Sequence, residues 1–364
     1  RSTQYTSVEV GSMNRQRTTA FLQGGIAIVL AALLLCNPKL SAEGFLDGIQ
    51  LCVQTVLPAL FPFFVLCEMM MNVPLPGRFL RYLQNAWGFC SEKSVFAVLV
   101  SWIGGYAVCA QLTGNLYCEG KISRRDALLI TMLGCCSSPG FVIGCVGGLL
   151  LQSVRLGVLL YGLQIVANLL STALCVPFLS SVKGDKQPRE NLSGFSRNAG
   201  LSLAIGNAVN SSLNVCGCVL FFRTVGAVLR PILPETPWSA ATLSMLLEIS
   251  AGCADFSALG GRVALYGCCL CLSVWGCSVW AQLSLLLRKS VLLPVLALQR
   301  IFFMIIFIFL VAAAVRFLPG TLTVYSSLTG RVVQSSRLPA DAAVVVFLFV
   351  CATLYKVRQN FYNK

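Results

Sequence analysis

Residues 102–114 read WIGGYAVCAQLTG and residues 274–285 read VWGCSVWAQLSL, so one short stretch occurs twice. When Gly105 is laid on Gly276, the register G-x-x-V-x-A-Q-L-[ST] holds in both copies. Each copy closes an apolar run with an amide and a hydroxyl side chain. Substrate sites of duplicated transporters form where the two halves meet, so this stretch predicts an internal duplication. Chance similarity between two helices rich in Ala, Gly and Leu is the alternative.

The composition indicates an integral membrane protein. Of the 364 residues, 57% are apolar and 11% are charged, whereas soluble domains carry about 25% charged residues. The apolar runs are long and continuous, which predicts transmembrane helices and not the alternating segments of an outer-membrane barrel. The formal charge of +14 is spread between these runs, which indicates membrane topology and contact with the lipid bilayer, not nucleic-acid binding.

The eighteen Cys lie inside apolar runs, where a thiol behaves as a small hydrophobe. Because the chain has no His, zinc sites of the Cys/His type and His-based catalysis are excluded. We therefore expect no metal, no cofactor, no catalytic residues and no enzyme activity.

The fold class predicted from these patterns is all-α: a polytopic helical membrane protein of two pseudo-symmetric repeats with broken or re-entrant helices. Residues 1–12 are polar and are expected to be a non-native or disordered tail. The first transmembrane repeat covers 13–181, a hydrophilic linker 182–198, and the second repeat 199–364. Expected spans or half-spans lie at 18–36, 45–71, 94–112, 127–151, 155–177, 201–222, 243–253, 263–287, 301–315 and 342–355.

Two segments should be broken. Residues 45–71 exceed one span and contain Pro58 and Pro62, and a proline removes a helical hydrogen bond and clashes with the preceding turn. A broken or hairpin-like segment is expected there. Residues 127–151 contain CCSSPG at 135–140, whose unwound turn would leave backbone groups free to face a ligand.

Seven polar side chains in or beside apolar segments are the candidate substrate-binding residues: Gln111, Thr113, Ser137, Ser138, Glu248, Ser278 and Gln282. Polar residues inside a membrane usually mark a pathway. For the amides, hydrogen bonding between helices is the alternative. For the serines it is helix capping, and for Glu248 it is an interfacial position or a salt bridge to Arg81 or Arg223. Glu68 has the same alternatives, and Asp255 is expected to be structural.

The order of these motifs resembles one known family. LFPFFVLCEMM at 60–70, GGYAVCAQLTGNL at 104–116, CCSSPGFVIGCVG at 135–147, LEISAG at 247–252 and WGCSVWAQLS at 275–284 together resemble the sporulation integral membrane proteins of the YlbJ/SpoVV type. These belong with the nucleoside-recognition or gate-domain proteins, which are similar to concentrative nucleoside transporters. The resemblance covers nearly the whole chain from Met13.

The resemblance implies transport of dipicolinic acid across the outer forespore membrane during sporulation, around a central site between two halves. The family pattern GYPxGAKLT differs here, because Ala107 replaces a Pro and Gln111 replaces a Lys. Cys135 and Cys136 stand where Asn residues are usual. A change in substrate preference should therefore be sought first at Gln111.

We expect a multi-pass protein of the cell membrane or outer forespore membrane that moves a small organic anion by alternating access. The alternative function is a non-transporting membrane scaffold or partner protein in spore assembly. The expected partners are a small-molecule substrate and the lipid bilayer; a homo-oligomer is left open.

Overall fold

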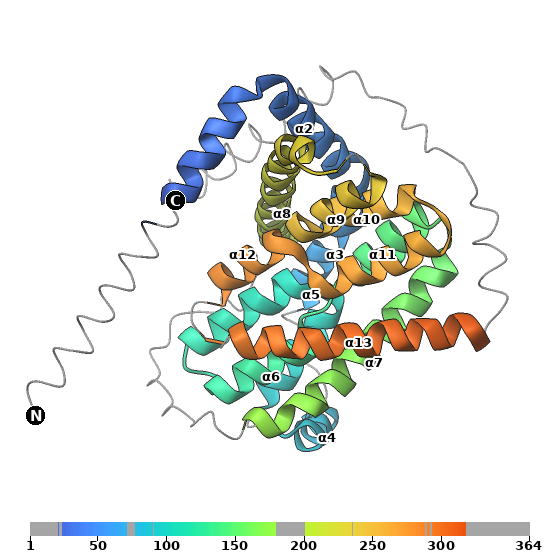
Figure 1. The fold of residues 1–364 in the computed structure, drawn as a ribbon. Helices are drawn as coiled ribbons and strands as arrows, with labels where there is room; N and C mark the ends of the chain where they lie inside the picture. The colour runs from blue at the N-terminus through green and yellow to red at the C-terminus, as the bar shows by residue number, and fades with distance from the viewer. Residues whose placement is uncertain are drawn as a thin grey trace, which may run out of the picture.

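The computed structural model describes residue 21 and residues 24–70, 77–89, 91–179, 201–234, 236–287, 290–291 and 293–317. Every regular element in this part of the chain is helical, which confirms the predicted all-α class, while the two pseudo-symmetric repeats stay a prediction (Figure 1). Three predicted features lie outside the described residues: the tail at 1–12, the linker at 182–198 and the last span at 342–355.

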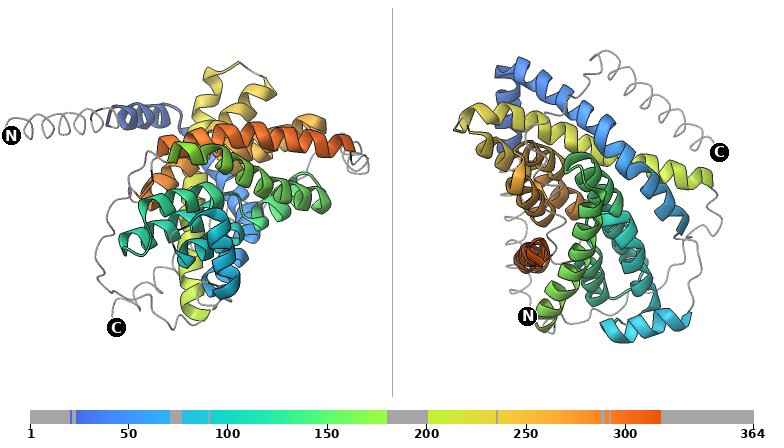
Figure 2. Two further views of the ribbon diagram at one scale, coloured as in Figure 1. Left: turned by 90° about the horizontal axis from the view of Figure 1, so that it is seen from below. Right: turned by 90° about the vertical axis from the view of Figure 1, so that its right-hand side faces the viewer.

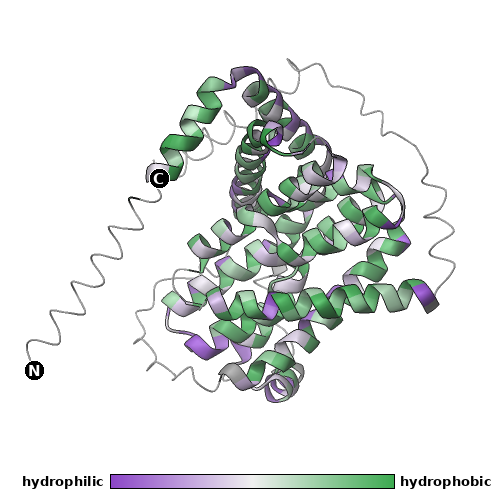
Figure 3. Cartoon of the chain, viewed as in Figure 1, coloured by the Kyte–Doolittle hydropathy of each residue, from purple (hydrophilic) through white to green (hydrophobic). Residues whose placement is uncertain are grey.

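Five helices in the described ranges are long and apolar enough to cross a membrane. They are Glu92–Cys118, Val154–Pro177, Leu201–Ile232, Gly261–Leu286 and Leu293–Arg316. Helices Gly24–Cys36 and Pro38–Val56 make a sixth candidate if they count as one span, although the chain bends by 101° between them. Hydrophilic positions inside the helices are few (Figure 3).

The prediction of a hairpin-like break within residues 45–71 is wrong. The helices α2 (Pro38–Leu51) and α3 (Leu57–Met70) are joined by the π-helical segment η1 (Cys52–Val56), and the chain stays helical throughout. The N–H of Leu57 donates a hydrogen bond to the carbonyl of Cys52, five residues earlier, as in a π-helix. A π-helical turn directly before Pro58 accommodates a residue that has no N–H to donate, so the helix continues.

The long helix α8 (Leu201–Leu229) packs along α2 and α3, and it ends in the short helix η3 (Arg230–Ile232). Two glycines of α2 allow this close packing. A Cβ added at Gly44 would lie 2.5 Å from the Cβ of Ala227, and one at Gly48 would lie 3.2 Å from the Cα of Leu220. Helices α2 and α8 therefore lie close together at these glycines (Figure 2).

The remaining helices form the rest of the bundle. They are α4 (Gly77–Trp87), α5 (Glu92–Cys118), α6 (Arg124–Gly134), the π-helix η2 (Gly140–Leu150), α7 (Val154–Leu179), α9 (Pro237–Leu247), α10 (Ile249–Ala258), α11 (Gly261–Val274), α12 (Gly276–Leu286) and α13 (Leu293–Phe317). Helix α5 packs on α6, α7 on η2 and α13, and α10 on both α9 and α11. Helix α13 also contacts α11, so α7, α11 and α13 meet beside the central breaks described next (Figure 1).

Candidate functional site

Both copies of the repeated stretch contain a break in the helix, at the aligned glycines. Gly105 has φ +81° and ψ −172° inside α5, and Gly276 has φ +70° at the start of α12. The preceding residue, Trp275, also has a positive φ of +71°. Side chains with a Cβ rarely adopt this region of backbone space, so the glycines permit the breaks.

Each of these breaks lies against a second break in the same half of the chain. A Cβ added at Gly105 would lie 3.0 Å from the N of Ser138, in the extended segment between α6 and η2. A Cβ added at Gly276 would lie 3.0 Å from the N of Glu248, which is extended (φ −152°, ψ 131°) between α9 and α10. The structure thus brings together two pairs of breaks, Gly105 with Ser138 and Gly276 with Glu248.

The two predicted serines have different surroundings. The Ser138 Oγ accepts a hydrogen bond from Phe141 N at 3.3 Å, so it caps the start of η2. The buried Ser137 Oγ has no partner among the described residues, whereas its backbone carbonyl accepts from Gln164 Nε2 at 3.0 Å. Capping thus accounts for Ser138 and leaves Ser137 free to contact a ligand.

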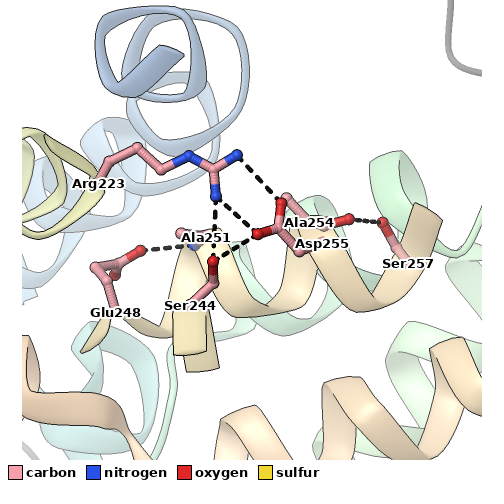
Figure 4. A network of polar contacts seen from close by, with 7 residues as sticks. All are labelled: Arg223, Ser244, Glu248, Ala251, Ala254, Asp255 and Ser257. Atoms are coloured by element: carbon pink, nitrogen blue, oxygen red, sulfur yellow. Dashed lines mark hydrogen bonds and ion pairs between the residues drawn. The ribbon is translucent and has the colours of Figure 1, made fainter. Parts of the chain in front are cut away.

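Glu248 is buried at the second pair of breaks, with 2% of its surface exposed. Its Oε2 accepts a hydrogen bond of 2.7 Å from Ala251 N, which makes it the N-cap of α10 (Figure 4). A negative charge at this position is favoured by the positive end of the helix dipole.

The salt bridges considered for Glu248 and Glu68 are not the contacts that form. Arg223 binds Asp255 through two bonds of 2.9 and 3.1 Å, and Asp255 also accepts from Ser244 (Figure 4). Asp255 therefore holds α9 and α10 to α8, in agreement with its expected structural role. Glu68 accepts instead from Asn207 Nδ2 at 3.0 Å.

A pocket between α2, α8, α9 and α10 reaches Glu248. Its charged lining consists of Asp47, Arg223, Arg230, Glu248 and Asp255, and Gly44, Gly226 and Ala251 also line it. The pocket therefore lies beside the N-terminal end of α10.

The predicted residues of the repeated stretch lie in different environments. Thr113 and Ser278 are buried, and neither hydroxyl has a hydrogen-bond partner within the described ranges. Gln282 is half-buried beside Cys218 of α8. Gln111 is exposed on α5, so it is not among the buried side chains at the breaks.

A buried polar network beside the breaks was missed in the sequence. Arg300 of α13 is only 4% exposed and donates hydrogen bonds to the carbonyls of Leu272 and Ser273, at the end of α11. Its NH1 group lies 3.4 Å from Asn168 Oδ1, and Asn168 Nδ2 lies 3.5 Å from Cys135 O in the first half. The sequence does contain a signal, because QR interrupts the apolar run LQRIFF at 298–303. The predicted span was 301–315 with its flanks, and Arg300 was not among the candidate residues.

Comparison with known proteins identified a curated relative. The chain is 27% identical over 160 residues to the sporulation integral membrane protein YlbJ of Bacillus subtilis. The matched part is 43% of this chain and 39% of that protein, so the similarity spans well under half of either. No protein-family model matches the chain. No solved structure matches it.

The relative supports the resemblance seen in the motifs, while the link to nucleoside-recognition proteins stays a prediction. Together, the candidate spans and this match make the chain a multi-pass integral membrane protein, and over 160 residues it is similar to the sporulation integral membrane protein YlbJ.

Proposed function

We propose that this protein is a transporter of a small organic anion, with dipicolinic acid across the outer forespore membrane as the best candidate. The relative is a sporulation protein of the membrane, which is consistent with a membrane role in sporulation. The observation that carries the proposal is the pairing of four helix breaks inside a helical membrane protein. Broken helices with buried ends are how many transporters build substrate sites near the middle of the bilayer.

The direction of the helix ends supports an anion as the substrate. Helices η2, α10 and α12 all begin at the breaks, at Gly140, Ile249 and Gly276. The N-terminal end of a helix carries a partial positive charge, and the Glu248 carboxylate already caps that of α10, so the ends of η2 and α12 are the ones that favour a further carboxylate nearby. Transport would need no covalent chemistry: one pair of breaks would move against the other around the bound anion.

The pocket beside Glu248 supports the same proposal, because it lies next to one of the two pairs of breaks. Its lining offers both arginines and carboxylates. Glu248 is thus the predicted site residue that a solute entering from this side would meet.

The second candidate is a non-transporting scaffold of spore assembly. It is favoured by the caps, because Ser138 and Glu248 already satisfy helix N–H groups within the protein. In this case the breaks would shape the fold and would bind nothing.

Proteoliposomes separate the two candidates. Purified full-length chain in vesicles should move radiolabelled dipicolinate down its gradient, and Ser137→Ala should reduce that flux while Gly144→Ala leaves it unchanged. Gly144 is a matched control in the following helix, because nothing lies within 4 Å of a Cβ added there. Vesicles without flux, together with a deletion strain whose spores contain normal dipicolinate but assemble poorly, would favour the scaffold.

A further inference from the structure

Arg300 is a buried cation without an anionic partner in the described part of the chain. The ion pairs found there join Arg81 to Glu92, Lys121 to Glu119 and Arg223 to Asp255, and none involves Arg300. Burying a charge without a counter-charge is costly, and inside a membrane such a residue usually serves a function. An anion bound near Arg300 would supply the missing counter-charge.

The groups around the guanidinium stabilise it without neutralising it. Its Nε and NH2 groups donate to backbone carbonyls at 2.9 to 3.1 Å, and the rings of Trp275 and Phe303 lie 3.9 and 3.7 Å from its central carbon. Carbonyl dipoles and aromatic faces attract a cation, but they carry no net charge. The positive charge is thus held in place and remains available.

Arg300 connects both pairs of breaks. The carbonyls that it binds end α11, directly before Trp275 and Gly276. On its other side, Asn168 links it to the carbonyl of Cys135, where α6 ends at the first pair of breaks. The ring of Trp275 also lies 6.2 Å from that of Tyr106, the residue after Gly105.

Polar atoms without partners lie along the same connection. The Trp275 Nε1, the Ser137 Oγ and the Gln164 Oε1 are buried, and none of them has a hydrogen-bond partner within the described residues. Buried polar atoms are nearly always paired in folded proteins, so atoms without partners indicate groups that a ligand could satisfy. The first two are donors, as a carboxylate requires.

We infer that Arg300 supplies the fixed positive charge that binds a carboxylate of the transported anion between the two pairs of breaks. This inference rests on the transport function proposed above and names the residue that would select an anion. The two rings cover the faces of the guanidinium, so a carboxylate would approach along its edge. The NH1 edge is the available one, because its partner Asn168 is at 3.4 Å, the longest of the bonds to Arg300. Arginine and carboxylate form strong, directional hydrogen bonds in this edge-on arrangement.

The sharpest test introduces an internal counter-charge. Asn168→Asp places a carboxylate of nearly the same shape against NH1, where the amide oxygen lies now. We expect this variant to melt at a higher temperature than the wild type and to bind dipicolinate at least tenfold more weakly. Arg300→Lys should retain part of the affinity, and Arg300→Gln should lose at least tenfold. Arg316→Gln is the matched control, because it removes the same charge from an exposed position of α13.

Binding is measured by titration calorimetry on the detergent-solubilised full chain, with dipicolinate and with its uncharged diamide. Support requires that wild type binds the dianion, and that Asn168→Asp and Arg300→Gln weaken the dianion more than the diamide. The inference is overturned if either variant binds dipicolinate as the wild type does, if both ligands weaken equally, or if the wild type binds neither. Flux is measured separately in vesicles. Arg300-dependent binding without flux would therefore overturn transport alone, and flux that is unchanged in Arg300→Gln would overturn the role of Arg300 alone.

Discussion

The two pairs of breaks have the same geometry but different chemistry. Around Gly105, the partner is Ser138, an uncharged cap, whereas around Gly276 it is Glu248, a buried carboxylate. Arg300 reaches both pairs, and the groups that it contacts there are carbonyl and amide oxygens, not carboxylates. The difference between the pairs is one of charge: the cap at Gly276 is a carboxylate, whereas the cap at Gly105 is an uncharged hydroxyl.

The pairs also differ in their order along the chain. In the first half the break at Gly105 precedes its partner, and in the second half the break at Gly276 follows its partner. If the two halves were repeats with the same order of helices, α5 would correspond to α9 and α10, and α6 to α11. The alignment of Gly105 with Gly276 instead makes α5 correspond to α11 and α12, which come later in the second half. The similarity of the two stretches is therefore local, and the two-repeat architecture remains a prediction.

The largest effect is expected from a Cβ at the glycines of the breaks. Gly276→Ala would add strain at φ +70° and bring the Cβ to 2.9 Å from Met245 O, so unfolding should become easier by about 2 to 4 kcal/mol. Gly105→Ala should cost a similar amount, about 2 to 4 kcal/mol, because φ +81° with ψ −172° is a conformation that essentially only glycine adopts and the added Cβ would lie 3.0 Å from Ser138 N. Thermal unfolding followed by size-exclusion chromatography measures both, and Gly144→Ala should behave as wild type. Equal melting temperatures for all three would refute the break geometry.

Next in size is the loss of the two caps. Glu248→Ala should lower the stability by about 1 to 2 kcal/mol, since it removes a charged N-cap, and Ser138→Ala by about 1 kcal/mol. Glu248→Asp is the control that keeps the charge but shortens the side chain. A larger loss for Ser138→Ala than for Glu248→Ala would reverse the contrast between the two pairs.

Neighbouring serines provide a smaller but cleaner contrast. Ser137→Ala removes a hydroxyl that has no partner in the described ranges, so we expect a change in stability of less than about 0.5 kcal/mol. Dipicolinate binding should nevertheless weaken several-fold. Ser138→Ala should show the opposite pattern, with lower stability and unchanged affinity. Identical behaviour of the two variants in calorimetry and melting would contradict the division between capping and binding.

The smallest effect is expected at Gln111. The side chain is exposed on α5, so Gln111→Ala should change stability by less than about 0.5 kcal/mol and leave flux near that of the wild type. Gln282→Ala, at the half-buried equivalent in the other copy, should be more disruptive. A specific loss of dipicolinate flux in Gln111→Ala would restore the earlier expectation that substrate preference is set there.

Patterns along the sequence were sufficient for the all-helical class and for one of the four breaks. The CCSSPG turn ends a helix for local reasons, whereas the breaks at Gly105, Gly276 and Glu248 were not predicted, and the break expected within residues 45–71 does not form. The buried position of Glu248 also followed from its apolar neighbours. These features depend on a few consecutive residues, so one sequence is enough to find them.

Contacts between distant helices could not be predicted in the same way. Nothing near Arg223 in the sequence selects Asp255 over Glu248, because that choice depends on how α8 meets α9 and α10. The role of Arg300 was missed because nothing in the sequence near it indicates that its side chain contacts α7 and α11. The continuous helix through Pro58 was missed because a π-helical turn has no simple sequence pattern.

The glycine contact between α2 and α8 has a consequence for how the protein could be made. This contact joins a helix from before residues 182–198 to one from after them, and α7 and α13 form a second junction across the same division. Both junctions are built from helix faces and do not require a continuous chain. Two separately translated polypeptides divided within residues 182–198 should therefore find each other in one membrane and reassemble, and Gly44→Leu should prevent it.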